Sequence, residues 1–366
     1  MMNRSKRAVG VGLGILIAGM FAGCGGLAGK PAKPAPIQGK RRATHRVQGA
    51  PRSRIRGSRS LPGTTPGKLE VMAYYATGKH MNLSALWKYP RAISVFSPFL
   101  YSVDSSGALV THHKVAAALA AVVKHGIPVE PLVNDATGVQ AFLSAPATRV
   151  AAARNVADMV RAGGYQGVGI DFEPPNTAAR HELVEFITEL RDRLPTKDVI
   201  SLAIVPHSRG AYDLKALGPE VNQFVLMSYD EHAAGTGPGP VASAIWVKNI
   251  LARTERSIPP AKILLGVPLY GYVWPKGSTQ AITIPYASIP AVVKAHARWD
   301  AAAQGLHSTY TASGTSYVAW WTNLRSMQDS LRLARRNKLA GVALWRLGYQ
   351  NDRVMQLLLK TIGPQH

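Results

Sequence analysis

The chain has 366 residues, of which 46% are hydrophobic, an ordinary value for a globular protein with one large α/β domain or two smaller ones. Its 43 Lys and Arg residues exceed its 20 Asp and Glu residues, giving a net charge of +23. Fourteen of the basic residues and no acidic residue lie between Met1 and Lys68. Aromatic residues do not alternate with these charges, which argues against nucleic-acid binding.

The first segment has the pattern of an export signal. Basic residues occupy Arg4–Arg7, a short apolar stretch follows over Val9–Ala22, and small residues precede Cys24, the only cysteine. The stretch is too short and glycine-rich for a membrane span. Small residues before a single cysteine are similar to a bacterial lipobox. Residues 1–24 are therefore predicted to be a lipoprotein-type signal peptide with Cys24 lipidated, and ordinary signal cleavage is the alternative.

Residues 25–68 are predicted to be a disordered basic linker. They are rich in Pro, Gly, Ser, Lys and Arg and have few large apolar side chains, so they cannot bury enough surface to fold. The basic run Arg52–Arg59 suits adhesion to anionic envelope polymers or lipid head groups. A solubilising spacer is an equally good interpretation of the same composition.

Eight strands are predicted after Leu69. Each is a short apolar run, and segments with helical periodicity lie between them. The predicted strands are Val71–Tyr75, Ile93–Phe99, Val129–Val133, Val168–Phe172, Ile200–Val205, Phe224–Ser228, Ile263–Val267 and Gly341–Trp345.

Four of the intervening segments repeat apolar residues every three or four positions, as expected of a helix packed on one face. They lie around residues 115–123, 150–160, 183–190 and 324–334. Gly126 and Gly163 follow the first two at positions suited to a C-cap.

Strands alternating with helices in residues 69–366 predict an α/β protein with a (β/α)8 TIM barrel. A long gap separates the seventh and eighth strands, and we expect it to hold a small α/β insertion at about residues 275–322. Within it, Ile282–Ile284 and Tyr317–Trp321 are strand-like, and Pro290–Gln304 is predicted to be a helix. In a TIM barrel the chemistry lies at the carboxyl ends of the strands.

The fourth strand carries the clearest chemical signal. Its residues alternate, so Val168 and Ile170 face one side while Asp171 and Glu173 face the other, about 7 Å apart along the strand. Two acids on a buried strand are costly unless they are used. Cleavage of a glycosidic bond uses such a pair, one as general acid and one to stabilise positive charge. Two solvated acids at a strand end are the alternative.

The fourth strand and two later motifs resemble glycoside hydrolase family 18. The family signature Asp-Gly-x-Asp-x-Asp-x-Glu is matched at Gly167, Asp171 and Glu173, but not at Gln166 and Gly169. The family's Met-x-Tyr-Asp motif of the sixth strand and the tryptophan of the eighth are also present. They correspond to Met227, Tyr229, Asp230 and Trp345.

A narrower resemblance is to the spore germination and cortex-lytic N-acetylglucosaminidases of that family. The similar runs are Gly164–Glu173, Tyr229–His232, Gly237–Ala242, Ile263–Trp274 and Trp345–Gly348, within a resemblance that covers about residues 69–362. It implies an exported hydrolase that cleaves β-linked N-acetylglucosamine in peptidoglycan, with spore cortex as one candidate substrate.

The resemblance implies roles for the site residues. Glu173 is expected to be the general acid, with a pKa raised by burial and by Asp171. Catalysis would be substrate-assisted and retaining, with Asp171 orienting the acetamide N–H and Tyr229 donating a hydrogen bond to its carbonyl. Asp230 would bind sugar hydroxyls, and Trp345 would form the floor of the subsite.

Further aromatic and apolar residues are candidates for sugar binding. They are Met227, Tyr270, Tyr272, Trp274 and Trp320, for which packing in the core is the alternative interpretation. Gly169 stands where the family has its middle carboxylate, and we expect a water molecule in the space left by the missing side chain.

Two alternative functions remain open from the sequence: a chitinase-like enzyme acting on chitin oligomers, and a non-catalytic carbohydrate-binding barrel. No cofactor and no metal site are expected, because neither metal-ligand spacing nor a nucleotide loop is found. We expect a monomer outside the cytoplasm, anchored in the membrane through its lipid or else secreted or in the spore envelope.

Overall fold

The computed structural model of the protein describes residues 68–76, 83–112, 116–138, 140–173, 176–206, 208 and 210–362. The predicted signal peptide with Cys24, and the predicted linker as far as residue 67, lie outside the described residues. Among the helices that are described, none combines the length and the apolar character needed to cross a bilayer.

Eight parallel strands form a closed barrel, which confirms the predicted (β/α)8 fold. Each strand pairs with the next along the chain, and the last returns to the first, where Gly341 lies opposite Glu70. In chain order they are β1 (Glu70–Tyr75), β2 (Val95–Val103), β4 (Leu132–Asp135), β5 (Gly167–Asp171), β6 (Val199–Ile204), β7 (Gln223–Leu226), β8 (Ile263–Pro268) and β14 (Gly341–Trp345). A short strand β3 (Leu109–Thr111) pairs antiparallel with β2.

The barrel strands are largely buried on both faces, as parallel strands covered by helices require. On β5, Val168 and Ile170 face outward into the large core shared with the helices. A Cβ atom on Gly169 would instead approach Leu132, which belongs to the smaller core inside the barrel. The predicted division of this strand into two faces is therefore confirmed.

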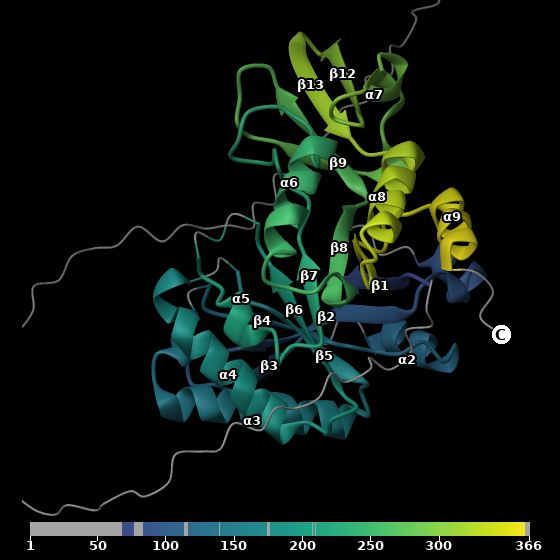
Figure 1. Cartoon of the computed structure of the whole chain (residues 1–366). Helices are drawn as coiled ribbons and strands as arrows, with labels where there is room; N and C mark the ends of the chain where they lie inside the picture. Colours follow the sequence, from purple (N-terminus) through teal and green to yellow (C-terminus); the bar gives the residue numbers. More distant parts are fainter. Residues whose placement is uncertain are drawn as a thin grey trace, which may run out of the picture. The chain divides into compact units, whose positions relative to one another are not determined.

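Helices surround the barrel (Figure 1). They are α1 (Ser84–Lys88), α2 (Ala116–Lys124), α3 (Pro146–Gly163), α4 (Arg180–Arg193), α5 (Leu214–Leu217), α6 (Ala244–Thr254), α8 (Leu324–Arg336) and α9 (Asp352–Ile362). Gly126 follows α2 in a left-handed conformation, as predicted. The left-handed cap of α3 is Gly164 and not Gly163, which is the last residue of the helix.

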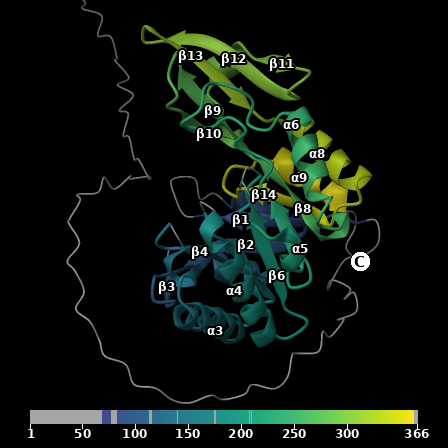
Figure 2. The ribbon, with the colours of Figure 1, turned by 60° about the vertical axis from the view of Figure 1, so that its left-hand side comes forward.

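The insertion between β8 and β14 forms a separate antiparallel sheet at one end of the barrel (Figures 1 and 2). Its strands run in the order β10-β9-β13-β12-β11. The elements are β9 (Tyr270–Pro275), β10 (Ile282–Pro285), α7 (Ala291–Ala295), β11 (Arg298–Asp300), β12 (Gly305–Ala312) and β13 (Thr315–Trp321).

The helix predicted over Pro290–Gln304 is wrong for most of its length. Only the five residues of α7 are helical, because Arg298–Asp300 pairs instead with the start of β12 in an antiparallel hairpin. β12 pairs in turn with all of β13, and this extended pairing outweighs the local helical pattern.

The start and the end of the insertion are bonded to each other. Thr322, just after β13, donates its hydroxyl to the carbonyl oxygen of Pro268 at 3.0 Å and to that of Tyr270 at 3.3 Å. The segment that leaves β8 and the segment that returns toward β14 therefore lie side by side.

Candidate active site

The two acids of the fourth barrel strand meet at its carboxyl end. Asp171 is the last residue of β5, Glu173 follows two residues later, and their carboxyl groups are hydrogen-bonded to each other. Asp171 is buried, and one of its oxygens, Oδ1, has no hydrogen-bond partner among the described residues. Glu173 is exposed. The pair therefore joins a buried acid to an acid that can reach a ligand.

Both pKa values are raised. Burial raises the pKa of Asp171 well above its usual range, and the charge of Glu173 and the shared hydrogen bond add to the effect. The pKa of Glu173 is raised chiefly by desolvation of its carboxyl group and further by the charge of Asp230. The hydrogen bond from Asp171 lowers the pKa of Glu173, so the predicted contribution of Asp171 has the wrong sign.

Tyr229 follows the sixth barrel strand, Trp345 is the last residue of the eighth, and their rings stack on each other. Their ring centroids are 6.3 Å apart with an interplanar angle of 17°. Both residues are half-buried, so each keeps some exposed surface. Phe99 packs against Trp345 at 5.3 Å from the β2 side. Aromatic contacts therefore fix the orientation of the predicted sugar platform.

Asp230 is held by two tyrosines of the insertion. The Tyr270 hydroxyl donates to Asp230 Oδ1 at 2.6 Å, and the Tyr272 hydroxyl donates to the same oxygen at 2.9 Å. Asp230 has a positive φ of 61°, which costs roughly 1–2 kcal/mol for a residue with a Cβ atom. Burial raises the pKa of Asp230, and the two tyrosine hydrogen bonds oppose that rise.

Some predicted sugar-binding residues are packed away from solvent. Trp274 is 0% exposed and Tyr270 is 2% exposed, so neither offers a surface to a sugar, and the predicted contacts of these two residues are wrong in this structure. Met227 and Tyr272 are also buried. Trp320 is half-buried and stacks on His307 at 4.8 Å, which leaves it the best placed of the insertion residues to meet a ligand.

The space beside Gly169 is occupied by a side chain. A Cβ atom on Gly169 would lie 2.8 Å from Leu132 Cδ1, 3.3 Å from Ser201 Oγ and 3.6 Å from Ser97 Oγ. The predicted water position is therefore wrong, because Leu132 of the neighbouring strand fills the room that a larger side chain would need.

Sequence reasoning missed two tyrosines near the acid pair. Tyr74 on β1 packs edge-on against Trp345 at 5.8 Å, and its pKa is raised well above the usual value by burial and by the nearby Asp171. Tyr212 is buried, and Asp171 and Glu173 also help to raise its pKa. The alternation of β1 could have placed Tyr74 inside the barrel, whereas Tyr212 lies in a loop that carries no such pattern.

The described part of the chain contains no group of three or more His, Cys, Asp or Glu side chains placed to hold a metal ion. The side chains gathered at the carboxyl end of β5 and its neighbours carry carboxyl, hydroxyl and aromatic groups.

Comparison with known families and proteins gives consistent matches. The family model of glycosyl hydrolases family 18 matches residues 133–350. "Putative sporulation-specific glycosylase YdhD" of Bacillus subtilis is 31% identical over 71% of this chain and 66% of that protein. "Cortical fragment-lytic enzyme" of Bacillus anthracis is 26% identical over 56% of this chain and 52% of that protein. The chain thus spans about one half to two thirds of the length of these curated relatives.

Solved structures with the same architecture include two bacterial enzymes. The spore cortex-lytic enzyme SleL of Bacillus cereus superposes with a TM-score of 0.74 at 21% identity, covering 82% of this chain and 76% of that chain. A chitinase from Chromobacterium violaceum superposes with a TM-score of 0.74 at 25% identity, covering 81% of this chain and 100% of that chain.

Proposed function

The chain belongs to glycosyl hydrolases family 18, and from that membership we propose that it cleaves β-linked N-acetylglucosamine in peptidoglycan, outside the cytoplasm and anchored to the membrane through Cys24. The single observation that carries the catalytic part is the hydrogen-bonded pair of Asp171 and Glu173 at the end of β5. The signal-like composition of residues 1–24 supports export and anchoring.

The proposed reaction is substrate-assisted and begins with one proton on the acid pair. Substrate binding brings the acetamide N–H to Asp171, which then favours its ionised form and leaves the proton on Glu173. The acetamide oxygen attacks the anomeric carbon, the glycosidic C–O bond breaks, and Glu173 gives its proton to the leaving oxygen. Asp171 and the Tyr229 hydroxyl stabilise the oxazolinium-like intermediate.

Water completes the reaction by attacking the anomeric carbon from the face that the leaving group has left. Glu173, now ionised, takes a proton from the attacking water, the oxazolinium ring opens, and the configuration at the anomeric carbon is retained. Trp345 and the tyrosine-held Asp230 would fix the sugar ring during both steps. No cofactor takes part in this scheme.

The names of the relatives support the proposed substrate class. The name of YdhD refers to sporulation, and the name of the cortical fragment-lytic enzymes refers to the cortex. Both names favour peptidoglycan as the substrate of this chain. The Chromobacterium violaceum chitinase, whose whole chain is covered, favours chitin oligomers as the second candidate. A non-catalytic carbohydrate-binding barrel is the third, because Gly169 and Gln166 depart from the family signature.

Glu173→Gln tests the proposal in the full-length chain. The variant keeps the shape of the side chain but has no proton to donate, so we expect hydrolysis to fall by at least about a hundredfold with little change in melting temperature. Glu189→Gln on the outer helix α4 is the matched control, and it should retain wild-type activity. Activity of Glu173→Gln equal to wild type would remove Glu173 from the role of general acid.

Products identify the substrate. Spore cortex, vegetative wall sacculi and chitin oligomers are each incubated with the full chain, and mass spectrometry identifies the sugar at each new reducing end. New N-acetylglucosamine ends from cortex or sacculi support the main proposal, and products from chitin alone support the second candidate. Saccharide binding without any product supports the binding barrel.

A further inference from the structure

A cavity opens between the helices α6 and α8. Its volume is about 220 Å³. That exceeds the roughly 10–15 Å³ that one water molecule needs and falls below the about 300–1,000 Å³ of sites for drug-sized ligands. The cavity therefore suits a small ligand. None of the predicted catalytic or sugar-binding residues lines it.

The floor of this cavity reaches the barrel wall. It is formed by Gly266–Pro268 of β8 and by Ser228, whose hydroxyl donates to the carbonyl oxygen of Gly266 at 2.7 Å. Ser228 is 1% exposed, so the side of the cavity nearest the barrel is formed by buried residues.

The rim carries an excess of positive charge. Lys248 projects from α6, and Arg332 and Arg336 lie four residues apart on α8, so the two arginines share one helix face. Asp329 is the one acidic residue of the lining and pairs with Arg332 at 2.5 Å. Three cations and one carboxylate give the lining a net charge of +2.

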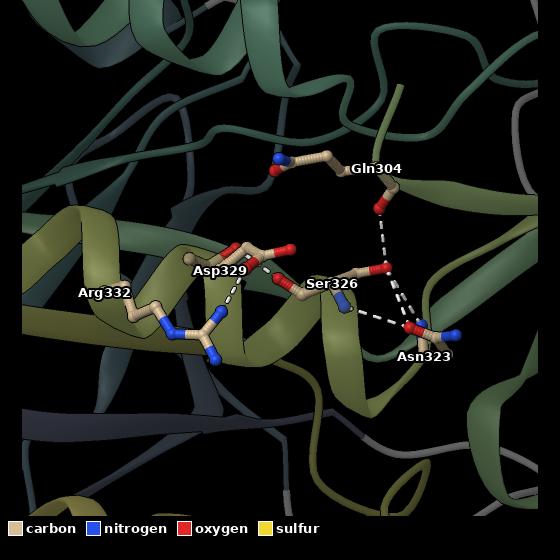
Figure 3. Close-up of polar contacts among 6 residues, drawn as sticks. Gln304, Asn323, Ser326, Asp329 and Arg332 are labelled. Atoms are coloured by element: carbon tan, nitrogen blue, oxygen red, sulfur yellow. Dashed lines mark hydrogen bonds and ion pairs between the residues drawn. The ribbon is translucent and has the colours of Figure 1, made fainter. Parts of the chain in front are cut away.

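Polar groups of the insertion complete the recess. Ser326 on α8 donates its hydroxyl to the carbonyl oxygen of Gln304 at 2.8 Å, which fixes the insertion against the helix (Figure 3). The guanidinium of Arg332 uses one of its N–H groups for Asp329 in the same view, and a guanidinium has five such groups. Lys248 and Arg336 form no ion pair with the residues that the structure describes.

We propose that this cavity between α6 and α8 binds a small ligand carrying a phosphate monoester, at a site separate from the catalytic pair. A phosphate monoester carries a charge of about −1.5 to −2 near neutral pH, which matches the net charge of the lining, whereas a carboxylate supplies only half of it. Arginine N–H groups and a lysine ammonium are the usual partners of phosphate oxygens.

Calorimetric titration of the full-length chain tests the proposal. The probes are inorganic phosphate, glycerol 3-phosphate and acetate, each at constant ionic strength. The double variant Lys248→Gln/Arg336→Gln removes two cations of the rim. The matched control Arg253→Gln/Arg353→Gln removes two exposed cations outside the cavity while leaving the basic N-terminal segment unchanged.

We expect saturable binding of a phosphate probe that weakens about tenfold or more in the cavity variant and stays near wild type in the control. Tighter binding of glycerol 3-phosphate points to an organic monoester, and tighter binding of inorganic phosphate points to the free ion. Equal weakening in both double variants, unsaturable binding, or equally tight binding of acetate would overturn the proposal.

A second variant guards against misfolding of the first. Ser330→Glu adds a carboxylate to the lining of the cavity without removing any cation, and Ser330 is only half-buried. A variant with a wild-type melting temperature should lose phosphate binding. Unchanged binding in such a folded variant would contradict the assignment of the site.

Discussion

At the scale of single residues, the acid pair is tuned by its neighbours in opposite directions. Desolvation and the charge of Asp230 raise the pKa of Glu173, while the hydrogen bond with Asp171 lowers it. Asp230 in turn depends on Tyr270 and Tyr272 of the insertion for its orientation. The protonation of Glu173 is thus linked to a sheet that lies outside the barrel.

Asp230→Asn tests this electrostatic link. A general acid works only while protonated, so activity falls as the pH rises through the pKa of the pair. Removing the charge of Asp230 removes one cause of the raised pKa of Glu173. We therefore expect the alkaline limb of the kcat/KM profile to move to lower pH, whatever the change in its maximum.

The control for this profile is Asp158→Asn, which removes a surface charge on α3 that is paired with Arg161. Its alkaline limb should coincide with that of wild type. A limb that stays in place or moves to higher pH in Asp230→Asn would show that Asp230 does not act on the acid through its charge.

Residues of the candidate site could be predicted from the sequence where a reactive side chain coincides with the end of a predicted strand. Asp171, Glu173 and Tyr229 were predicted at strand ends and lie together in the structure. The hydrogen bond from Tyr272 to Asp230 could not be predicted, because it joins a strand of the insertion to a loop residue 42 positions away in the sequence. Aromatic character alone also could not show that Trp274 is buried.

At the scale of elements, the packing of β4 against β5 depends on the absence of a side chain at Gly169. The inward side of Gly169 faces Leu132 on the neighbouring strand, and a Cβ atom there would be 2.8 Å from Leu132 Cδ1. Interiors are close-packed, so an added methyl group forces a neighbour to move. Leu132 therefore occupies the space that a side chain at position 169 would need.

Gly169→Ala tests this fit. We expect a loss of about 1–3 kcal/mol in the free energy of unfolding, measured by urea denaturation, because Leu132 must shift. Combining it with Leu132→Val, which shortens the obstructing side chain, should recover part of the loss. Gly237→Ala is the control, since no atom lies within 4 Å of its added Cβ. A loss no larger than in the control would mean that the core accommodates the methyl group freely.

Elements of the barrel were easier to predict than those of the insertion. The barrel strands are short apolar runs with helices between them, and all eight were found in order. β12 was missed because its residues are mostly polar and half-exposed, and its pairing with β13 decides its structure. The same pairing explains why the predicted helix stops after Ala295.

At the scale of the whole domain, two further carboxyl groups are buried at the amino-terminal end of the barrel. Burial raises the pKa of Glu70 to about 7 and that of Glu130 to about 8. Gln223 donates a hydrogen bond to Glu70 at 2.6 Å. One oxygen of each carboxyl group has no hydrogen-bond partner among the described residues.

These groups predict that the domain becomes less stable as the pH rises. Their pKa values are higher in the folded protein than in the unfolded chain, where a value near 4.5 applies. The folded state therefore binds more protons between about pH 4.5 and 8, and the free energy of unfolding falls across that window by on the order of a few kcal/mol before levelling off.

Melting temperatures of wild type, Glu130→Gln and Glu189→Gln across that pH window check this expectation. Glu130→Gln should flatten the decline because it removes the group with the higher pKa. Glu189→Gln, on the surface of α4, should follow wild type. A wild-type melting temperature that rises from pH 5 to pH 8 would contradict the assignment.

The bond between the two ends of the insertion has a consequence for how the insertion can be altered. β8 and β14 are adjacent in the barrel and pair directly as far as Pro268 and Trp345, so the insertion between them is not needed to connect their hydrogen bonds. A longer or shorter insertion would therefore leave the pairing of β8 with β14 in place. Because β9 supplies both hydroxyls that hold Asp230, removing this strand would release the carboxylate, whereas the outer hairpin of β11 and β12 supplies neither of these hydroxyls.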